Sequence, residues 1–362
     1  MAQTTTYDVL EKVIDYSNRF LAPRDLPRGL FDAVATGMTL KAPEFHWWEK
    51  KQRPRTSALT ADYTAGGFAF TVASTLPYTI GSVVGVAGVS YKVTAINAST
   101  KVLTVALLNG TDADASTGVA VDVLSNANVE GSASNEAERM PKVKAENVTQ
   151  IMRETAKVSN TMMVTDKEAG ANEMTEQVAD IISQFRYNIA KQLWSGYKVA
   201  PSDNTGTRIA GGVPLFVKAN GYAPAGASLT GANLSAFVQY IYDTQGGTPR
   251  ELWMNPATQA TISGFDSSYL RRDVDGATGT TRGTYATKFV TLNGVELMIK
   301  TDVDIPTTEI YAMNSADVQF RPLRTLTSSP LGKVGDYTEV EVVAEISFEI
   351  NPSNQMGVFT IS

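Results

Sequence analysis

The side chains that most often carry catalysis and metal binding are nearly absent from this chain. Its 362 residues include one histidine, His46, and no cysteine. A metal site built from several histidines or thiolates is therefore excluded, and a Ser-His-Asp triad would have to use His46. Because His46 lies among Phe45, Trp47 and Trp48, we expect a packed, hydrogen-bonded side chain rather than a catalytic base.

Two other segments resemble ligand-binding motifs but lack essential positions. Asp275–Gly283 is rich in glycine, yet it does not join a clear strand to a clear helix, and the chain has no P-loop sequence. Thr111–Asp114 resembles half of a calcium loop without the glycine and the glutamate that complete such a loop. We therefore predict a plain loop and an exposed turn, and we expect no catalytic residue, no cofactor and no metal.

The composition is that of a globular chain with room for two or three domains. Hydrophobic residues make up 43% and charged residues 19%, which argues against bulk disorder. The formal net charge of -6 does not favour bulk attraction to nucleic acid. No apolar run approaches the ~20 residues of a membrane-spanning helix. The start of the sequence, Met1–Thr6, lacks the pattern of a signal peptide, so we expect no membrane partner.

A basic, extended segment is interrupted by a block with a different pattern. Leu40–Arg55 stops at Ala58–Gly131, which is rich in glycine and β-branched residues, and a second basic segment, Glu138–Lys144, follows. This order predicts a long two-stranded loop that carries a small barrel or sandwich. Because isolated two-stranded ribbons are marginal in water, we expect a neighbouring copy of the chain to cover the loop.

The charges of the loop suggest what it contacts. We predict that its basic residues lie across an acidic face of an adjacent subunit, or across the acids Glu173, Glu176 and Asp180 of a long helix. Exposed ion pairs contribute only ~0–1 kcal/mol each, so the loop aromatics should supply most of the stabilisation. A nucleic-acid contact of the basic arms is a weaker alternative. The candidate contact residues are Phe45, Trp47, Trp48, Lys50, Lys51, Arg53, Arg55, Arg139, Lys142 and Lys144 on the loop, and Glu339, Glu341, Glu345 and Glu349 on the acidic face.

The remaining elements follow from periodicity and turn signals. Apolar residues three or four apart predict a long helix over Asn172–Gly196, with Asn172 at the N-cap and Gly196 just past the end. Thr205–Gly231 is predicted mostly as loop. Along Glu339–Ile350, alternation predicts one core face and one exposed acidic face that includes Glu345 and Ser347. Further predictions are helices over Tyr7–Leu21, Leu234–Tyr242 and Asn255–Ile262, a hairpin over Phe289–Ile299, and closing strands over Glu309–Met313, Val318–Leu323, Tyr337–Ile350 and Met356–Ile361.

This order of elements resembles a known family. The segments that carry the likeness are Lys41–Trp48, Arg139–Gln150, Glu173–Gly196, Trp253–Ala257 and Leu331–Asp336. In that order and spacing they resemble the major capsid proteins of tailed bacteriophages with the Hong Kong-type capsid fold. The likeness is strongest to the branch whose extended loop carries an inserted β domain, and it covers nearly all of the chain outside the insert.

The resemblance implies an α+β fold with five parts. These are an N-terminal arm (residues 1–40), an extended loop (41–57 and 134–150), an inserted β domain (58–133), a peripheral domain with a long spine helix (151–205 and 288–362) and an axial domain (206–287). The implied function is structural, with no enzymatic activity. Copies would form hexamers and pentamers of an icosahedral shell around double-stranded DNA, in a virion assembled in the host cytoplasm. Portal, scaffolding or decoration proteins are the other implied partners.

Three alternatives stay open from the sequence. An encapsulin-like shell shares the fold and would show a groove for a cargo peptide. A surface-layer or adhesion subunit would use the insert to bind glycan and would need a secretion signal. An enzyme with paired carboxylates would need two acids that converge in a pocket.

Overall fold

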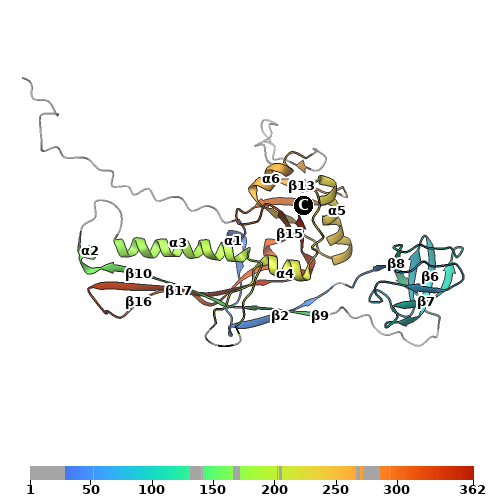
Figure 1. Ribbon diagram of the computed structural model, residues 1–362, viewed down its shortest axis with the longest axis horizontal. Helices are drawn as coiled ribbons and strands as arrows, with labels where there is room; N and C mark the ends of the chain where they lie inside the picture. Colours follow the sequence, from blue (N-terminus) through green and yellow to red (C-terminus); the bar gives the residue numbers. More distant parts are fainter. Residues whose placement is uncertain are drawn as a thin grey trace, which may run out of the picture.

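The structure is a computed structural model of the chain, and it describes residues 29–51, 53–130, 140, 142–165, 172–201, 203, 206–265, 270–271, 286–292 and 294–362. The predicted helix Tyr7–Leu21, the loop residue Arg139 and the glycine-rich segment Asp275–Gly283 lie outside the described residues. Figure 1 shows an elongated body, a two-stranded ribbon beneath it, and a small β domain beyond the far end of the ribbon.

One part of the body is a long sheet that lies against a long helix, on the left of Figure 1. The sheet has the order β1-β16-β17-β10, with β1 parallel to β16 and the other pairs antiparallel. Strand β17 pairs with both β10 and β16, and its residues from Ala344 to Phe348 are all buried. The elements of this part are α1 (Gly29–Ala33), β1 (Ala35–Thr36), β10 (Gln150–Ser159), α2 (Asn160–Val164), α3 (Glu173–Leu193), β16 (Val318–Pro330) and β17 (Tyr337–Ile350).

Helix α3 is the predicted long helix, and its start is as expected. The Asn172 side chain accepts a hydrogen bond from the Met174 amide, which satisfies one of the free N–H groups of the first turn. Its apolar stripe ends in Phe185, Ile189 and Leu193, which are buried in the main core. The prediction for Gly196 is wrong, because the helix is already capped at Trp194 with a right-handed backbone, φ -94°.

The other part of the body is a six-stranded sheet covered by helices, at the top of Figure 1. Its strand order is β12-β13-β14-β11-β15-β18. The predicted hairpin is confirmed, with Gly294 at φ +82° in the turn between β13 and β14. The Asn255 side chain caps α6 by accepting a hydrogen bond from the Ala257 amide at 3.0 Å. The elements are α5 (Gly231–Tyr240), the π-helical turn η1 (Ile241–Gln245), β11 (Glu251–Met254), α6 (Pro256–Ile262), β12 (Leu270–Arg271), β13 (Lys288–Val290), β14 (Glu296–Thr301), β15 (Glu309–Met313), the 3-10 turns η2 (Ser315–Asp317) and η3 (Ser353–Gln355), and β18 (Gly357–Thr360).

A helix occupies part of the segment that was predicted mostly as loop. Helix α4 (Val213–Asn220) begins after Gly212 and has proline in its first turn. Its apolar residues Val213, Phe216 and Val217 join the same core as α3. A side chain at Gly212 would lie 2.3 Å from the carbonyl oxygen of Leu193, so the glycine permits this close approach. Most of the described part of the segment is loop, as predicted. The sequence did not indicate this helix because it is short and is held by packing rather than by its own periodicity.

The ribbon and the small β domain form separate sheets. Strands β2 (Glu44–Lys50) and β9 (Lys142–Val148) pair antiparallel as the ribbon. The β domain has the order β3-β8-β5-β6-β7-β4. Hydrogen bonds from Thr60 N to Thr71 O and from Ala73 N to Ala58 O, both 2.9 Å, join its two edges. It is therefore a closed barrel with its own core, made of β3 (Thr56–Ala58), β4 (Ala69–Thr71), β5 (Ser82–Val86), β6 (Val89–Asn97), β7 (Val102–Asn109) and β8 (Ala120–Asn126).

The strand register defines two ends of the barrel. At the inner end, where the chain enters from the ribbon and returns to it, Thr56 pairs with Asp122 and Ser82 pairs with Asn126. At the opposite end, Val86 pairs with Val89 and Ser90 pairs with Asn109. We call this opposite end the outer end and define it by residues 62–68, 86–90 and 106–117.

Candidate assembly surface

The ribbon has one face turned to the body and one turned to solvent. Successive side chains of a strand point to opposite faces, and the burial of β2 and β9 follows this period. Trp47, Glu49, Ala145 and Asn147 are buried on the inner face. The outer face is formed by Glu44, His46, Trp48, Lys50, Lys142, Lys144 and Glu146, which are exposed.

Trp47 binds the ribbon to its own body. Its ring lies 5.2 Å from that of Phe216 in α4 and 5.7 Å from that of Phe45. The side chain is only 6% exposed, whereas that of Trp48 is 58% exposed. The prediction that Trp47 stabilises a contact between subunits is therefore wrong in its physical basis, because the ring is already buried within one chain. Trp48 keeps the surface that the prediction requires.

A buried carboxylate holds the same strand. Glu49 is 2% exposed and accepts hydrogen bonds from Trp47 Nε1 at 2.8 Å, from Ser353 Oγ at 2.9 Å and from the Asn354 amide at 3.3 Å. Ser353 lies in the turn before β18, far along the chain, so the bonds join the ribbon to the second sheet. Burying a charge is costly unless it is bonded in this way. Sequence reasoning missed Glu49, because its neighbours Lys50 and Lys51 suggested an exposed strand.

A buried asparagine fixes the other strand. Asn147 Nδ2 donates to the carbonyl oxygens of Gly211 at 2.9 Å and Phe348 at 2.8 Å. Its Oδ1 accepts from the amides of Gly211 and Val148, each at 2.9 Å. The side chain therefore satisfies both its donors and its acceptor inside the protein. These bonds attach β9 to β17 and to the start of α4.

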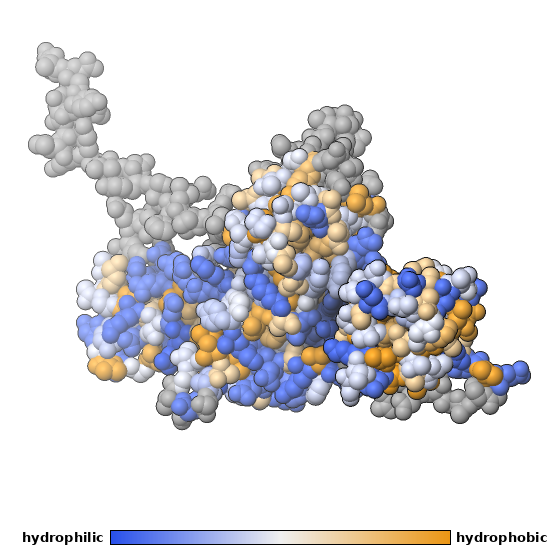
Figure 2. Space-filling view, turned by 45° about the vertical axis from the view of Figure 1, so that its right-hand side comes forward, coloured by the Kyte–Doolittle hydropathy of each residue, from blue (hydrophilic) through white to orange (hydrophobic). Residues whose placement is uncertain are grey.

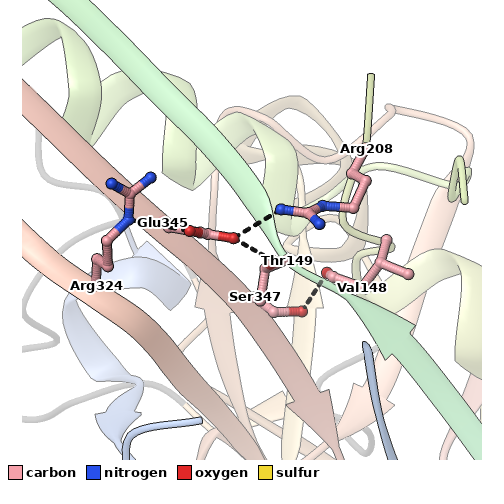
Figure 3. Close-up of polar contacts among 6 residues, drawn as sticks. All are labelled: Val148, Thr149, Arg208, Arg324, Glu345 and Ser347. Carbon is pink, nitrogen blue, oxygen red and sulfur yellow. Dashed lines mark hydrogen bonds and ion pairs between the residues drawn. The ribbon is translucent and has the colours of Figure 1, made fainter. Parts of the chain in front are cut away.

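A polar cluster surrounds the point where β9 continues into β10 (Figure 3). Glu345 Oε1 accepts from Thr149 Oγ1 at 2.7 Å and from Arg208 Nη2 at 2.8 Å, and Oε2 accepts from Arg324 Nε at 3.0 Å. Beside it, Ser347 donates to the carbonyl oxygen of Val148 at 2.7 Å. Two guanidinium groups and one hydroxyl thus hold a single buried carboxylate at the root of the ribbon.

The predicted exposed acidic face of β17 is wrong at these positions. Glu345 is 4% exposed and Ser347 is fully buried, because the end of β9 with Thr149, and the segment before α4 that carries Arg208, lie against this face. The other three predicted acids are less buried but already paired within the chain. Glu339 lies 3.0 Å from Lys157, Glu341 lies 3.5 Å from Arg153, and Glu349 pairs with Arg321.

The outer face of the ribbon is the basic surface of this region. Lys50 and Lys142 lie directly opposite each other across the strands, and like charges in that arrangement are unfavourable. Lys51 and Arg55 come after β2 in the chain and are also exposed. Within the described part of the chain, Lys50, Lys51, Arg55 and Lys142 form no ion pair. Lys144, in contrast, pairs with Glu146 at 3.2 Å.

Arg53 has a different role from the one predicted. Its guanidinium donates to the carbonyl oxygens of Leu76 and Tyr78, the latter at 3.3 Å. Both carbonyls belong to the barrel, so Arg53 anchors the barrel to the strand that leads into it. Some of the predicted contact residues, such as Trp47 and Arg53, therefore contact their own chain. Others remain exposed on the loop: Trp48, Lys50, Lys51, Arg55 and Lys142.

Carboxylates hold the loops at the outer end of the barrel by hydrogen bonds, and we call Asp112 with its partners Tyr63, Tyr91 and Gly66 the clasp. Asp112 accepts from Tyr91 Oη at 2.7 Å, from Tyr63 Oη at 2.9 Å and from the Gly66 amide at 2.6 Å. The bond from Tyr91 is the main cause that holds the pKa of Asp112 below its ordinary value of 3.8. Burial raises the pKa of Tyr91. The clasp is thus built for an ionised Asp112 and neutral tyrosines.

This clasp predicts an acid-sensitive barrel. Because the folded chain lowers the pKa of Asp112, its carboxylate stabilises the folded state above pH 3.8, and this stabilisation is lost as the pH falls below that value. The difference in melting temperature between the wild type and Asp112→Asn, measured against pH, should be constant near neutrality and shrink in acid. A difference that does not change with pH would contradict the prediction.

No group of three or more side chains that ligate metals converges within the described residues. None of the helices that the structure describes is both long and apolar enough to cross a membrane.

Comparison with known proteins gives the family. The family model described as SU10 major capsid protein matches residues 2–361. No curated protein sequence matches the chain.

Solved structures with similar folds include two from phages and one from a GTA particle. The capsid of a native GTA particle computed with C5 symmetry has a TM-score of 0.54 and 8% identity, over 99% of this chain and 97% of that one. A structure from Microbacterium phage Oxtober96 has a TM-score of 0.51 and 10% identity, over 100% of both chains. One from Mycobacterium phage Bobi has a TM-score of 0.50 and 10% identity, over 100% of this chain and 99% of that one.

At such low identities these structures show a shared fold and nothing finer. They confirm the predicted α+β capsid fold, with helices and strands matched along the whole chain. Because the family match extends over nearly every residue, the protein belongs to the SU10 major capsid protein family.

Proposed function

We propose that copies of this chain form hexamers and pentamers that close into an icosahedral shell around double-stranded DNA. The observation that carries the proposal is the family match over residues 2–361. The net charge of -6 supports a container that does not adhere to its DNA. In this proposal the role is structural, the five-part division of the chain holds as predicted from sequence, and portal, scaffolding or decoration proteins join the shell in the virion.

The ribbon is the proposed contact element between copies. Trp47, Glu49 and Asn147 attach the inner face of the ribbon to the body of the same chain. The direction of the ribbon relative to the body is therefore fixed before assembly. The outer face of the ribbon presents Trp48 together with Lys50 and Lys142, neither of which forms an ion pair with the residues that the structure describes. A surface with a fixed direction and exposed positive charge is suited to a contact that determines how two copies are oriented, more than how tightly they bind.

Electron microscopy of the purified full-length protein tests the shell directly. We expect closed particles of uniform diameter that are built from rings of copies. A protein that stays monomeric at high concentration, with and without an added scaffolding protein from the same virus, would contradict the proposal.

Charge reversal on the outer face tests the ribbon. In Lys50→Glu/Lys142→Glu we expect an unchanged melting temperature, because exposed substitutions of this kind alter stability by about 0.5 kcal/mol or less. We expect a lower yield of shells and a lower salt concentration at which they fall apart. Lys101→Glu, on an exposed turn of the barrel, is the matched control. Equal shell yields in both variants would count against the proposed contact.

A further inference from the structure

The outer end of the barrel presents an aromatic side chain on a fixed loop. Phe68 has a left-handed backbone, φ +45°, and a side chain that is 38% exposed. A bulky residue in this conformation is strained, and such strain persists only where surrounding contacts impose it. Here the preceding amides are held by carboxylates, Ala65 N by Asp114 at 2.8 Å and Gly66 N by Asp112 at 2.6 Å.

Apolar residues of β7 lie beside Phe68. The Val105 amide donates to the carbonyl oxygen of Phe68 at 2.9 Å, which fixes the loop against this strand. Further along the same strand, Leu107 is 39% exposed and Leu108 is 51% exposed. Figure 2, in which the barrel comes forward, shows apolar surface on parts of the barrel. Aromatic residues, including phenylalanine, are enriched in the core of protein interfaces.

The charge of the outer end is uniformly negative. Asp62, Asp112 and Asp114 lie there, and neither residues 59–91 nor residues 102–119 contain a lysine or an arginine. The outer face of the ribbon has a net positive charge. It carries Lys50, Lys142 and Lys144 on the same face as the exposed ring of Trp48, against Glu44 and Glu146, and the exposed Lys51 and Arg55 follow β2 in the chain. The two surfaces therefore complement each other in charge, and each offers exposed aromatic surface.

We propose that the outer end of the barrel, centred on Phe68, Leu107 and Leu108, docks on the outer face of the ribbon of a second copy of this chain. This inference rests on the proposed shell function and names the partner of the ribbon surface. The barrel is closed and joins its own ribbon at the inner end, so its outer end points away from that ribbon. The contact is therefore head-to-tail, and head-to-tail contacts between identical chains close into rings or continue as chains.

Chemical cross-linking tests the contact, because the chain has no cysteine of its own. Asn109→Cys lies at the outer end beside the patch, and Lys51→Cys lies on the basic surface. The full-length double variant, assembled and treated with a short bis-maleimide, should give a ladder of linked dimers, trimers and larger products on a denaturing gel. Each single variant should give at most dimers.

A matched control moves the first cysteine to the other end of the barrel. Ser99 lies in the turn between β6 and β7 and is exposed, so Ser99→Cys/Lys51→Cys should give no ladder. Circular dichroism and thermal melting of each variant against the cysteine-free parent show that the barrel is folded. A ladder from the Ser99 pair without one from the Asn109 pair would overturn the proposal.

The substitution Phe68→Gly tests the docking contact without destabilising the barrel. Glycine adopts a left-handed backbone without strain, so the variant keeps or gains stability while it loses the aromatic ring. In the Asn109→Cys/Lys51→Cys background it should lower the linked fraction about ten-fold. Ala87→Gly relieves the same kind of backbone at φ +50° without removing a large side chain, and it should leave linking unchanged. Linking should also fall as salt rises to about 1 M.

The outcomes for the shell and for the contact are distinct. Shells together with the ladder support both proposals. Shells without the ladder, or with a ladder that Phe68→Gly leaves unchanged, overturn the docking inference and leave the shell function standing. A ladder without shells supports the docking contact and contradicts the shell. Absence of both contradicts both.

Discussion

Replacing Trp47 by alanine is expected to lower the free energy of unfolding by about 3–5 kcal/mol, the usual cost of removing a large buried aromatic side chain. Two losses add here. The ring packs between Phe45 and Phe216, so its removal leaves a cavity between the ribbon and the body. The indole also donates to the buried Glu49, which would lose one of its partners. Chemical denaturation of the unassembled protein measures the effect.

Trp48→Ala is the matched control, because the adjacent ring lies on the opposite face. It is expected to change the free energy of unfolding by about 0.5 kcal/mol or less, since the side chain is 58% exposed. Its effect should appear in assembly instead, as fewer shells or weaker cross-linking. Equal destabilisation by the two substitutions would mean that the ribbon does not have the two unlike faces described here.

Replacing Glu345 by alanine is expected to destabilise the chain by about 2–3 kcal/mol, the range for hydrogen bonds to a charged group that are lost in a buried site. The carboxylate joins Thr149, Arg208 and Arg324, so its loss leaves two cations close together and one hydroxyl unpaired. This destabilisation is smaller than that from removing one partner of a fully buried ion pair, because the Arg324 side chain is 55% exposed and water can solvate it. Thermal or chemical denaturation reports the change.

A surface ion pair gives the comparison for Glu345. Glu296 lies 3.4 Å from Lys288, and both side chains are about 40% exposed. Glu296→Ala should therefore cost at most about 1 kcal/mol. Glu345→Gln keeps the shape of the side chain and one acceptor oxygen. Its loss of unfolding free energy should lie between those of Glu345→Ala and Glu296→Ala. If Glu345→Ala were no more destabilising than Glu296→Ala, the polar cluster at the root of the ribbon would contribute little to the fold.

Local patterns in the sequence were sufficient for most elements. The stripe of α3, the side-chain caps at Asn172 and Asn255, and the turn at Gly294 each depend on neighbouring residues and are present in the structure. Strand β17 matches its predicted range for the same reason, and the β pattern of Ala58–Gly131 is present as the barrel. The family resemblance rests on the order of these elements, which single residues do not alter.

The burial of polar side chains was not predictable from the same patterns. Glu49 and Glu345 stand at positions where alternation or neighbouring charges indicate solvent, but residues distant in sequence cover them. Their partners, such as Ser353 for Glu49 and Arg208 for Glu345, are visible only once the chain is folded. For the same reason the candidate contact set mixed structural residues with exposed ones, and the outer end of the barrel was not singled out.

The two junctions of the barrel have a consequence for engineering. The chain enters at β3 and leaves after β8, and these strands are neighbours at one end. A foreign domain whose termini are equally close could replace the barrel without altering the register of β2 against β9. The loops at the outer end of the barrel, which lie away from both junctions, are therefore suitable places to insert a foreign peptide.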